Sequence, residues 1–125
     1  MAPDPVDAHR DTVMLVCGGR SYTDKERLWS TLNGFLQSRR VRRVISGGAR
    51  GADTMAEDWA KARGIECVVF HADWAKYGRA AGPIHNQQML DEGRPTLVVA
   101  FPDGRGTADM VRRARSAGVE VIEVK

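Results

Sequence analysis

Short apolar runs alternate along this chain with segments whose apolar residues recur at helical spacing. Five runs rich in Val, Ile and Leu predict strands at residues 12–17, 42–46, 66–70, 96–101 and 119–124. Between them, the spacing predicts helices that begin near Thr23, span 52–63, follow Pro83 and span 107–117. Regular alternation of strands and helices is typical of an α/β sheet with parallel strands.

The predicted helices have recognisable ends and apolar faces. Residues 23–26 fit a capping box that begins with Thr23, and Gly64 is placed to end the second helix. Pro83 suits a first helical turn, and Gly93 with Pro95 ends that helix. We expect these residues to face the core: Leu28, Leu32, Phe35, Leu36, Ala52, Met55, Ala56, Trp59, Ala60, Ile84, Met89, Leu90, Ala108, Val111 and Ala114.

Right-handed crossovers between parallel strands predict a three-layer, Rossmann-like α/β sandwich, a five-stranded parallel sheet with strand order 3-2-1-4-5. The last strand alternates apolar and acidic residues, which suits an edge. Residues 12–125 are expected to form one domain, preceded by a disordered arm at 1–11. Segment 71–82 is long for a strand-to-helix connection, and we expect an ordered, functional loop there.

Composition limits the possible partners only slightly. The 19 Lys+Arg and 16 Asp+Glu give a net charge of +3, which favours anionic ligands without requiring nucleic acid. No apolar run approaches a membrane span of about 20 residues, and residues 1–11 lack a signal-peptide core, so a cytoplasmic protein is expected. Cys17 and Cys67 lie on the first and third strands, about 10 Å apart across the second, and are expected to be free thiols.

Glycine-rich turns follow three of the predicted strands. Glycine lets backbone N–H groups approach an anion, and the helix that follows adds partial positive charge at its N-terminus. The strand order brings the three turns to one edge of the sheet, where they predict a composite site for a phosphate-bearing small molecule. Two further candidates are Arg79, in the segment before the third helix, and Asn86, within that helix. The predicted ligand-binding residues are Gly18, Gly19, Arg20, Ser46, Gly47, Gly48, Arg50, Gly51, Asp53, Arg79, Asn86, Pro102, Gly104, Gly106 and Thr107.

Several side chains near these turns have two interpretations. Asp53 either contacts a ribose hydroxyl or supports the first turn of its helix, and Thr107 also suits an N-cap. Tyr22 either stacks on a base or packs against its own loop. The aromatic residues of the long segment, Trp74 and Tyr77, together with Arg79, form either a lid over a base or ribose or a hydrophobic plug.

Four motifs in order, Gly18-Gly19-Arg20-x-Tyr22, residues 46–53, residues 78–83 and residues 100–110, resemble the SLOG superfamily. More narrowly, they are similar to its small YspA/YpsA-related branch, which is common in bacteriophages. The resemblance implies a Rossmann-like fold and a nucleotide or nucleotide-derived ligand, with no cofactor. It also implies a homo-oligomer, and it relates the chain to LOG-type phosphoribohydrolases and to the single-strand DNA-binding protein DprA.

The chain departs from the LOG motif Pro-Gly-Gly-x-Gly-Thr-x-x-Glu at two positions. Asp103 replaces the first glycine, and Met110 stands where the catalytic glutamate would be. Methionine cannot transfer a proton, so binding for sensing or sequestration is favoured over LOG-like hydrolysis. The enzymatic alternative retains the candidates His85, Asp109 and Asp53; His85 stands where the branch often has arginine.

A run of basic residues at 39–43 joins the first helix to the second strand, on the edge opposite the glycine turns. A solvated basic corner is the default interpretation. The rival is contact with the backbone of single-stranded DNA in the manner of DprA, extended by Arg112, Arg113 and Arg115. The three histidines show no metal-ligand spacing.

Overall fold

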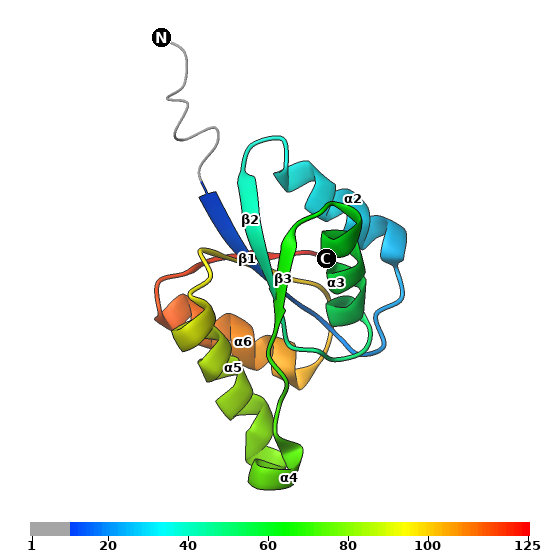
Figure 1. The fold of residues 1–125 in the computed structure, drawn as a ribbon. Helices are drawn as coiled ribbons and strands as arrows, with labels where there is room; N and C mark the ends of the chain where they lie inside the picture. The colour runs from blue at the N-terminus through cyan, green and yellow to red at the C-terminus, as the bar shows by residue number, and fades with distance from the viewer. Residues whose placement is uncertain (1–10) are drawn as a thin grey trace.

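A five-stranded parallel sheet runs through the computed structural model, which describes residues 11–125 (Figure 1). Its strand order is β3-β2-β1-β4-β5, so the predicted α/β fold class and strand order are confirmed. The predicted N-terminal arm lies outside the described residues except for Asp11, which is the first residue of β1. The strands are β1 (Asp11–Cys17), β2 (Arg40–Ser46), β3 (Glu66–Val69), β4 (Leu97–Ala100) and β5 (Glu120–Glu123).

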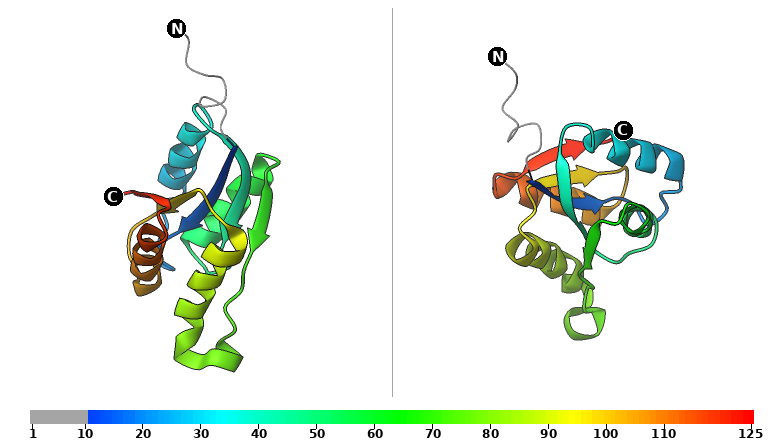
Figure 2. Two further views of the ribbon diagram at one scale, coloured as in Figure 1. Left: turned by 90° about the vertical axis from the view of Figure 1, so that its left-hand side faces the viewer. Right: turned by 45° about the horizontal axis from the view of Figure 1, so that its top comes forward.

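Helices cover both faces of the sheet (Figure 2). On one face lie α2 (Lys25–Phe35) and α3 (Ala52–Ala62); on the other lie α5 (Ala81–Gly93) and α6 (Arg105–Ser116). The short helix α4 (Trp74–Tyr77) and the 3₁₀ turn η1 (Gly78–Ala80) precede α5. Among the described helices, none is long and apolar enough to cross a membrane.

The central strand β1 separates two apolar cores. It pairs with β2 on one side and β4 on the other, and successive side chains of a strand point to opposite faces. Met14 and Val16 therefore pack towards α2 and α3, while Leu15 packs towards α5 and α6. The alternating strand β5 lies at an edge, as predicted.

The predicted start and inner face of the first helix need correction. Asp24 caps α2, because its carboxylate accepts a hydrogen bond from the Arg27 N–H (3.1 Å); the Thr23 capping box is wrong. The helix ends at Phe35, so Leu36 lies beyond the buried stripe and is exposed. Leu28 and Leu32 are buried as predicted.

The segment predicted to be a loop at 71–82 is largely helical. It contains α4 and η1, and α5 begins at Ala81, so Pro83 is its third residue. Ile84 is exposed, which contradicts its predicted core position, whereas Met89 and Leu90 are buried. Gly93 remains helical and permits close packing, since a Cβ there would lie 2.6 Å from Ile45 Cδ1; the left-handed residue that follows is Arg94.

The last helix begins earlier than predicted. Its N-cap is Gly104, which places Thr107 inside the first turn and removes Thr107 as a cap. Ala108 is exposed instead of inward, because the buried stripe of α6 consists of Met110, Val111 and Ala114. Met110 thus fills the core between α6 and the sheet.

Candidate functional site

A cleft of about 730 Å³ lies at the carboxyl edge of the sheet. The turns that follow β1, β2 and β4 are here called the β1, β2 and β4 turns. The walls of the cleft come from the β1 and β2 turns, from the part of α6 that follows the β4 turn, and from the segment 71–89. The volume suits a small-molecule ligand, and ligands of open α/β sheets bind at this edge. Nine predicted ligand-binding residues line the cleft: Gly18, Arg20, Gly47, Gly48, Asp53, Arg79, Asn86, Gly106 and Thr107.

The other predicted residues build the turns and lie outside the lining. The Gly19 N–H donates to the Pro102 carbonyl (3.0 Å), and the Gly19 carbonyl accepts from the Ala52 N–H (3.3 Å). These bonds tie the β1 turn to both neighbours. Gly51, with φ of 77°, packs directly against the backbone of the β1 turn. The six residues outside the lining are Gly19, Ser46, Arg50, Gly51, Pro102 and Gly104.

The β2 turn uses two of its own amides internally. The Ser46 hydroxyl donates to Glu57 (2.6 Å) and accepts from the Gly48 N–H (3.1 Å). The Ala49 N–H donates to Asp53 Oδ2 (3.1 Å). In this conformation these two amides are engaged, so this turn shapes the wall of the cleft more than it offers donors to a phosphate.

The N-terminus of α6 supplies donors and positive charge to the cleft. Its N-cap glycine provides no side-chain cap and its first turn has no acidic residue, and the first-turn amides of a helix lack intrahelical partners. Gly106 and Thr107 of this turn line the cleft, as do Arg105 and Arg112. This end therefore suits an anionic group.

The sequence interpretation missed Arg105 and Arg112. The sequence considers Arg112 only as an extension of the basic run in the DNA-binding alternative, whereas the structure places it in the cleft lining. The missed signal is the spacing of seven residues, which brings two side chains to one face of a helix after two turns. Arg105 itself lies inside the glycine motif of the β4 turn.

Asp53 lies on the cleft floor with only 7% of its surface exposed. Burial raises the pKa of its carboxyl to about 7; the hydrogen bond from Ala49 opposes the rise, and the nearby Glu57 adds to it. The same carboxyl would lie 3.0 Å from a Cβ added to Gly47. Asp53 therefore exchanges a proton near neutral pH while it holds the β2 turn in place.

Asp53 is expected to make the stability of the protein depend on pH. Between pH 3.8 and about 7 the folded protein keeps a proton that the unfolded chain has released, so the free energy of unfolding falls as pH rises. The fall amounts to at most about 4 kcal/mol. Urea unfolding at several pH values should show that the free energy of unfolding depends less on pH in Asp53→Asn than in Asp58→Asn, an exposed control on α3. An equal pH dependence in the two variants would contradict the attribution of this effect to Asp53.

The catalytic candidates His85 and Asp109 differ in how many hydrogen bonds they already make within the protein. His85 donates from Nε2 to the Phe70 carbonyl, which only accepts, so this nitrogen carries the proton. Its ring lies over Gly47 in the cleft wall. Asp109 accepts hydrogen bonds from Asn86 (3.0 Å), Arg113 (2.8 Å) and Arg112.

This network holds Asp109 as an anion. Partial burial acts to raise its pKa, but the hydrogen bonds from Asn86 and Arg113 and the charges of Arg113 and Arg112 keep it below the ordinary value. Asn86 also donates to the Gly106 carbonyl (3.0 Å), which links α5 to the first turn of α6. Asp109 and Asn86 thus hold the N-terminal end of α6 in place, and Asp109 is a poor proton donor.

The aromatic candidates separate into two groups. Trp74 lines the cleft with Arg79, whereas Tyr77 lies outside the lining beside Lys76. Tyr22 packs against Phe101 with ring centroids 5.4 Å apart, which favours its packing interpretation. Only Trp74 of the three therefore retains a place where it meets a ligand.

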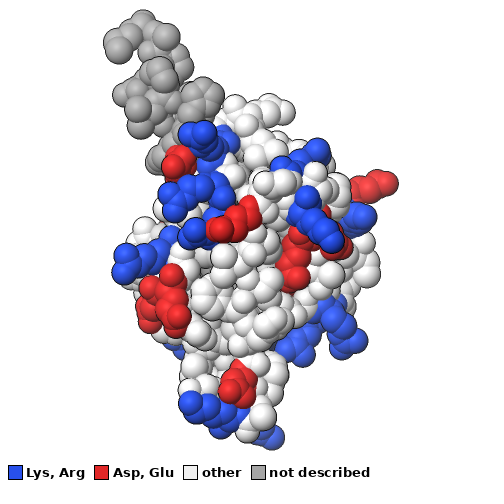
Figure 3. Space-filling model, in the orientation of Figure 1, with Lys and Arg blue, Asp and Glu red and all other residues white. Residues whose placement is uncertain are grey.

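The basic run at 39–43 lies at the amino edge, where charges of both signs intermingle near the start of β1 (Figure 3). Arg39 pairs with Glu120 (3.0 Å) and Arg43 with Glu66. Arg40 and Arg42 each lie 4.0 Å from Asp11. Neighbouring carboxylates thus balance much of this charge.

Cys17 lines the cleft, whereas Cys67 lies outside its lining. Cys17 and Cys67 are free, on strands that β2 separates. Burial raises the pKa of both, that of Cys67 to about 11, so neither is a thiolate near neutral pH. Within residues 11–125, no group of three His, Cys, Asp or Glu side chains is placed to hold a metal ion.

Comparison with known proteins places these features in context. A model of the YspA, cpYpsA-related SLOG family matches residues 12–77, which include the β1 and β2 turns and Trp74. Gene 61 protein of Mycobacterium phage D29 is 36% identical over 117 residues, covering 87% of this chain and 93% of the phage protein.

A solved structure shows the same fold. DNA processing protein A (DprA) from Streptococcus pneumoniae matches 96% of this chain with a TM-score of 0.72 and 17% sequence identity. This chain spans 52% of the length of that DprA chain.

Proposed function

Because this chain belongs to the YspA, cpYpsA-related SLOG family, we propose that its cleft binds a nucleotide or nucleotide-derived small molecule. Family membership supports a nucleotide- or nucleic-acid-related role in general. One observation carries the small-molecule form: a cleft of about 730 Å³ combines an uncapped helix N-terminus with several arginines. The arginines in its lining are Arg20, Arg79, Arg105 and Arg112.

The phosphate of the ligand would lie at the N-terminus of α6. Free first-turn amides and the helix dipole favour an anion there. Arg105 adds a guanidinium, which forms strong, directional hydrogen bonds with phosphate. Asp109 already engages Arg112, so Arg105 is the better placed of the two to meet the ligand.

Binding for sensing or sequestration is the form of this function that we favour. Met110 replaces the LOG glutamate and is only 1% exposed, in the core and outside the cleft lining. A second candidate is hydrolysis of an N-glycosidic or phosphoester bond. One observation favours it: Asp53, whose pKa burial raises to about 7, and His85 both line the cleft and both approach Gly47. Chromatography of AMP and NAD incubated with the protein would reveal such turnover.

Binding of single-stranded DNA ranks below both. The arginines expected to contact the DNA backbone at the amino edge lie beside Asp11, Glu66 and Glu120. Affinity for DNA would also fall steeply with salt.

A screen with AMP, ADP-ribose, NAD and cyclic nucleotides tests the proposed function. A ligand at 100 times its Kd should stabilise the protein by about 2.7 kcal/mol and raise the Tm by roughly 10 °C. Arg105→Gln should weaken binding about tenfold, because a charged hydrogen bond to phosphate is lost. Arg42→Gln, at the opposite edge, should leave binding unchanged.

Equal weakening in both variants would show that only overall charge matters. No shift with any ligand at millimolar concentration would overturn the proposal.

A further inference from the structure

Two planar side chains, Trp74 and Arg20, face each other in the lining of the cleft. We infer that they form a base subsite, in which the aromatic base of the ligand stacks between the indole and the guanidinium. This inference rests on the proposed function and deepens it, because it assigns the base to one place and the phosphate to another. It predicts that the protein binds nucleotides more tightly than sugar phosphates that lack a base.

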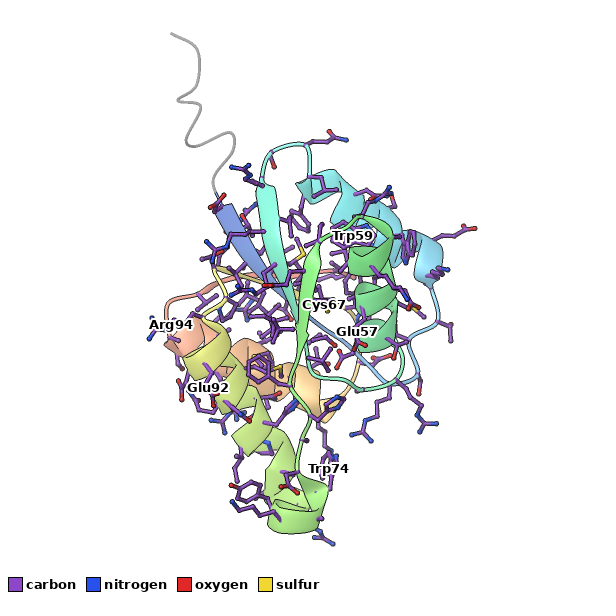
Figure 4. The ribbon with its side chains drawn as sticks, in the orientation of Figure 1. Glu57, Trp59, Cys67, Trp74, Glu92 and Arg94 are labelled. Atoms are coloured by element: carbon purple, nitrogen blue, oxygen red, sulfur yellow. The ribbon has the colours of Figure 1, made fainter. Side chains whose placement is uncertain are left out.

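The exposure of Trp74 argues against the interpretation that it is a hydrophobic plug beneath its own segment. Its surface is 51% exposed, whereas the tryptophan that fills the core, Trp59, is fully buried. In Figure 4, Trp74 lies near the junction of α4 with the rest of the domain, far from Trp59. An aromatic face left open inside a ligand-sized cleft is suited to stacking on a flat partner.

The distance between Arg20 and Trp74 is larger than a direct contact and smaller than the gap that a stacked base needs. The Arg20 Cζ lies 5.6 Å from the centroid of the indole ring, looser than the 3.5–4.0 Å of atoms in direct contact. A base sandwiched between two planes needs about 7 Å, twice the 3.4 Å rise between stacked bases. An outward movement of the exposed Arg20 side chain therefore admits a base, and both faces of the base are then covered.

Local structure holds the indole in position. Asp73 caps α4 by accepting a hydrogen bond from the Lys76 N–H (3.0 Å). The edge of the indole packs beside Gly82 at the start of α5, since a Cβ there would lie 3.7 Å from Trp74 Cη2. The platform is therefore preorganised, and only the arginine has to move.

Tyr77 provides a matched control within the same short helix. It is another exposed aromatic side chain of α4, but it lies outside the cleft lining. A general effect of aromatic residues on α4 would involve both side chains, whereas the base subsite involves Trp74 alone.

The test compares AMP and ADP-ribose with ribose 5-phosphate, which lacks the base, by titration calorimetry. Trp74→Leu should weaken AMP and ADP-ribose about tenfold or more, as expected for loss of one base–aromatic stack. The same variant should leave ribose 5-phosphate unchanged, which also shows that the cleft remains folded. Trp74→Phe should recover part of the affinity, and Tyr77→Leu should behave as the unchanged protein.

Tryptophan fluorescence gives an independent readout. AMP should quench the unchanged protein and the Trp29→Phe variant, since Trp29 lies on α2 outside the cleft lining, and should not quench Trp74→Leu. Equal weakening of AMP and ribose 5-phosphate by Trp74→Leu would overturn the base subsite and leave the proposed function standing. Quenching by oligo-dT but not by AMP would assign Trp74 to single-stranded nucleic acid and overturn the inference. Absence of binding by all three small molecules, and by the NAD and cyclic nucleotides of the screen, would overturn the inference and the proposed function together.

Discussion

Gly51→Ala is expected to destabilise the domain by about 3–5 kcal/mol, through backbone strain and a steric clash. Gly51 has φ of 77° and ψ of −125°, a combination that L residues with a Cβ rarely adopt. A Cβ at this position would lie 2.6 Å from the Arg20 carbonyl oxygen and closer still to that of Gly19. Backbone atoms cannot move aside as the end of a flexible side chain does, so the β1 and β2 turns would have to separate.

The functional consequence of Gly51→Ala follows from the same contact. The β1 turn carries Arg20, and the β2 turn carries Gly47 and Asp53, which all line the cleft. Separation of these turns would displace several walls at once, so nucleotide binding should be lost even below the melting temperature. Urea unfolding and calorimetry on the same samples measure the two effects.

Gly64→Ala is the matched control. Gly64 also has a positive φ, of 68°, but a Cβ there would meet nothing within 4 Å. Its substitution should therefore cost only the left-handed backbone penalty of roughly 1–2 kcal/mol and leave binding intact. Equal losses of stability in the two variants would show that the backbone angle alone matters and that the contact between turns contributes nothing.

The sequence predicted the sheet and the edge where the glycine turns meet, because both follow from local patterns. Strands such as β1 are buried on both faces, which leaves a continuous apolar run that can be recognised without coordinates. The role of each glycine was not predictable in the same way. Gly47 lines the cleft while Gly51 packs against a neighbouring turn, and that difference depends on contacts between residues distant in sequence.

Helix ends account for most of the wrong predictions. Thr23 and Thr107 both suit an N-cap by residue type, but the helices begin at other positions, after Asp24 and Gly104. The apolar spacing still placed the inner face correctly, since Val111 and Ala114 are buried as predicted, and only Ala108, near the start of α6, is exposed. Residue type describes a local preference, and packing against the sheet selects the register.

Met110→Glu, which restores the LOG carboxylate, is expected to destabilise the protein by about 4 kcal/mol or more and to create no hydrolase. Met110 is 1% exposed and packs among apolar residues such as Leu15, Val98 and Ala114. A carboxylate there would be buried without a partner in that cluster. Its pKa would rise, so the loss of stability should shrink as pH falls and the group becomes protonated.

Met110→Leu is the control, with an expected cost below about 1.5 kcal/mol, because it conserves volume and polarity. Urea unfolding at pH 5 and pH 8 measures both variants, and release of adenine from AMP measures activity. A Met110→Glu protein that is as stable as the unchanged chain and hydrolyses AMP would mean that this side chain reaches the cleft. The chain would then be one substitution away from a LOG-type enzyme. The buried position of Met110 argues instead that the helix face itself differs, so that a single carboxylate at residue 110 does not restore hydrolysis.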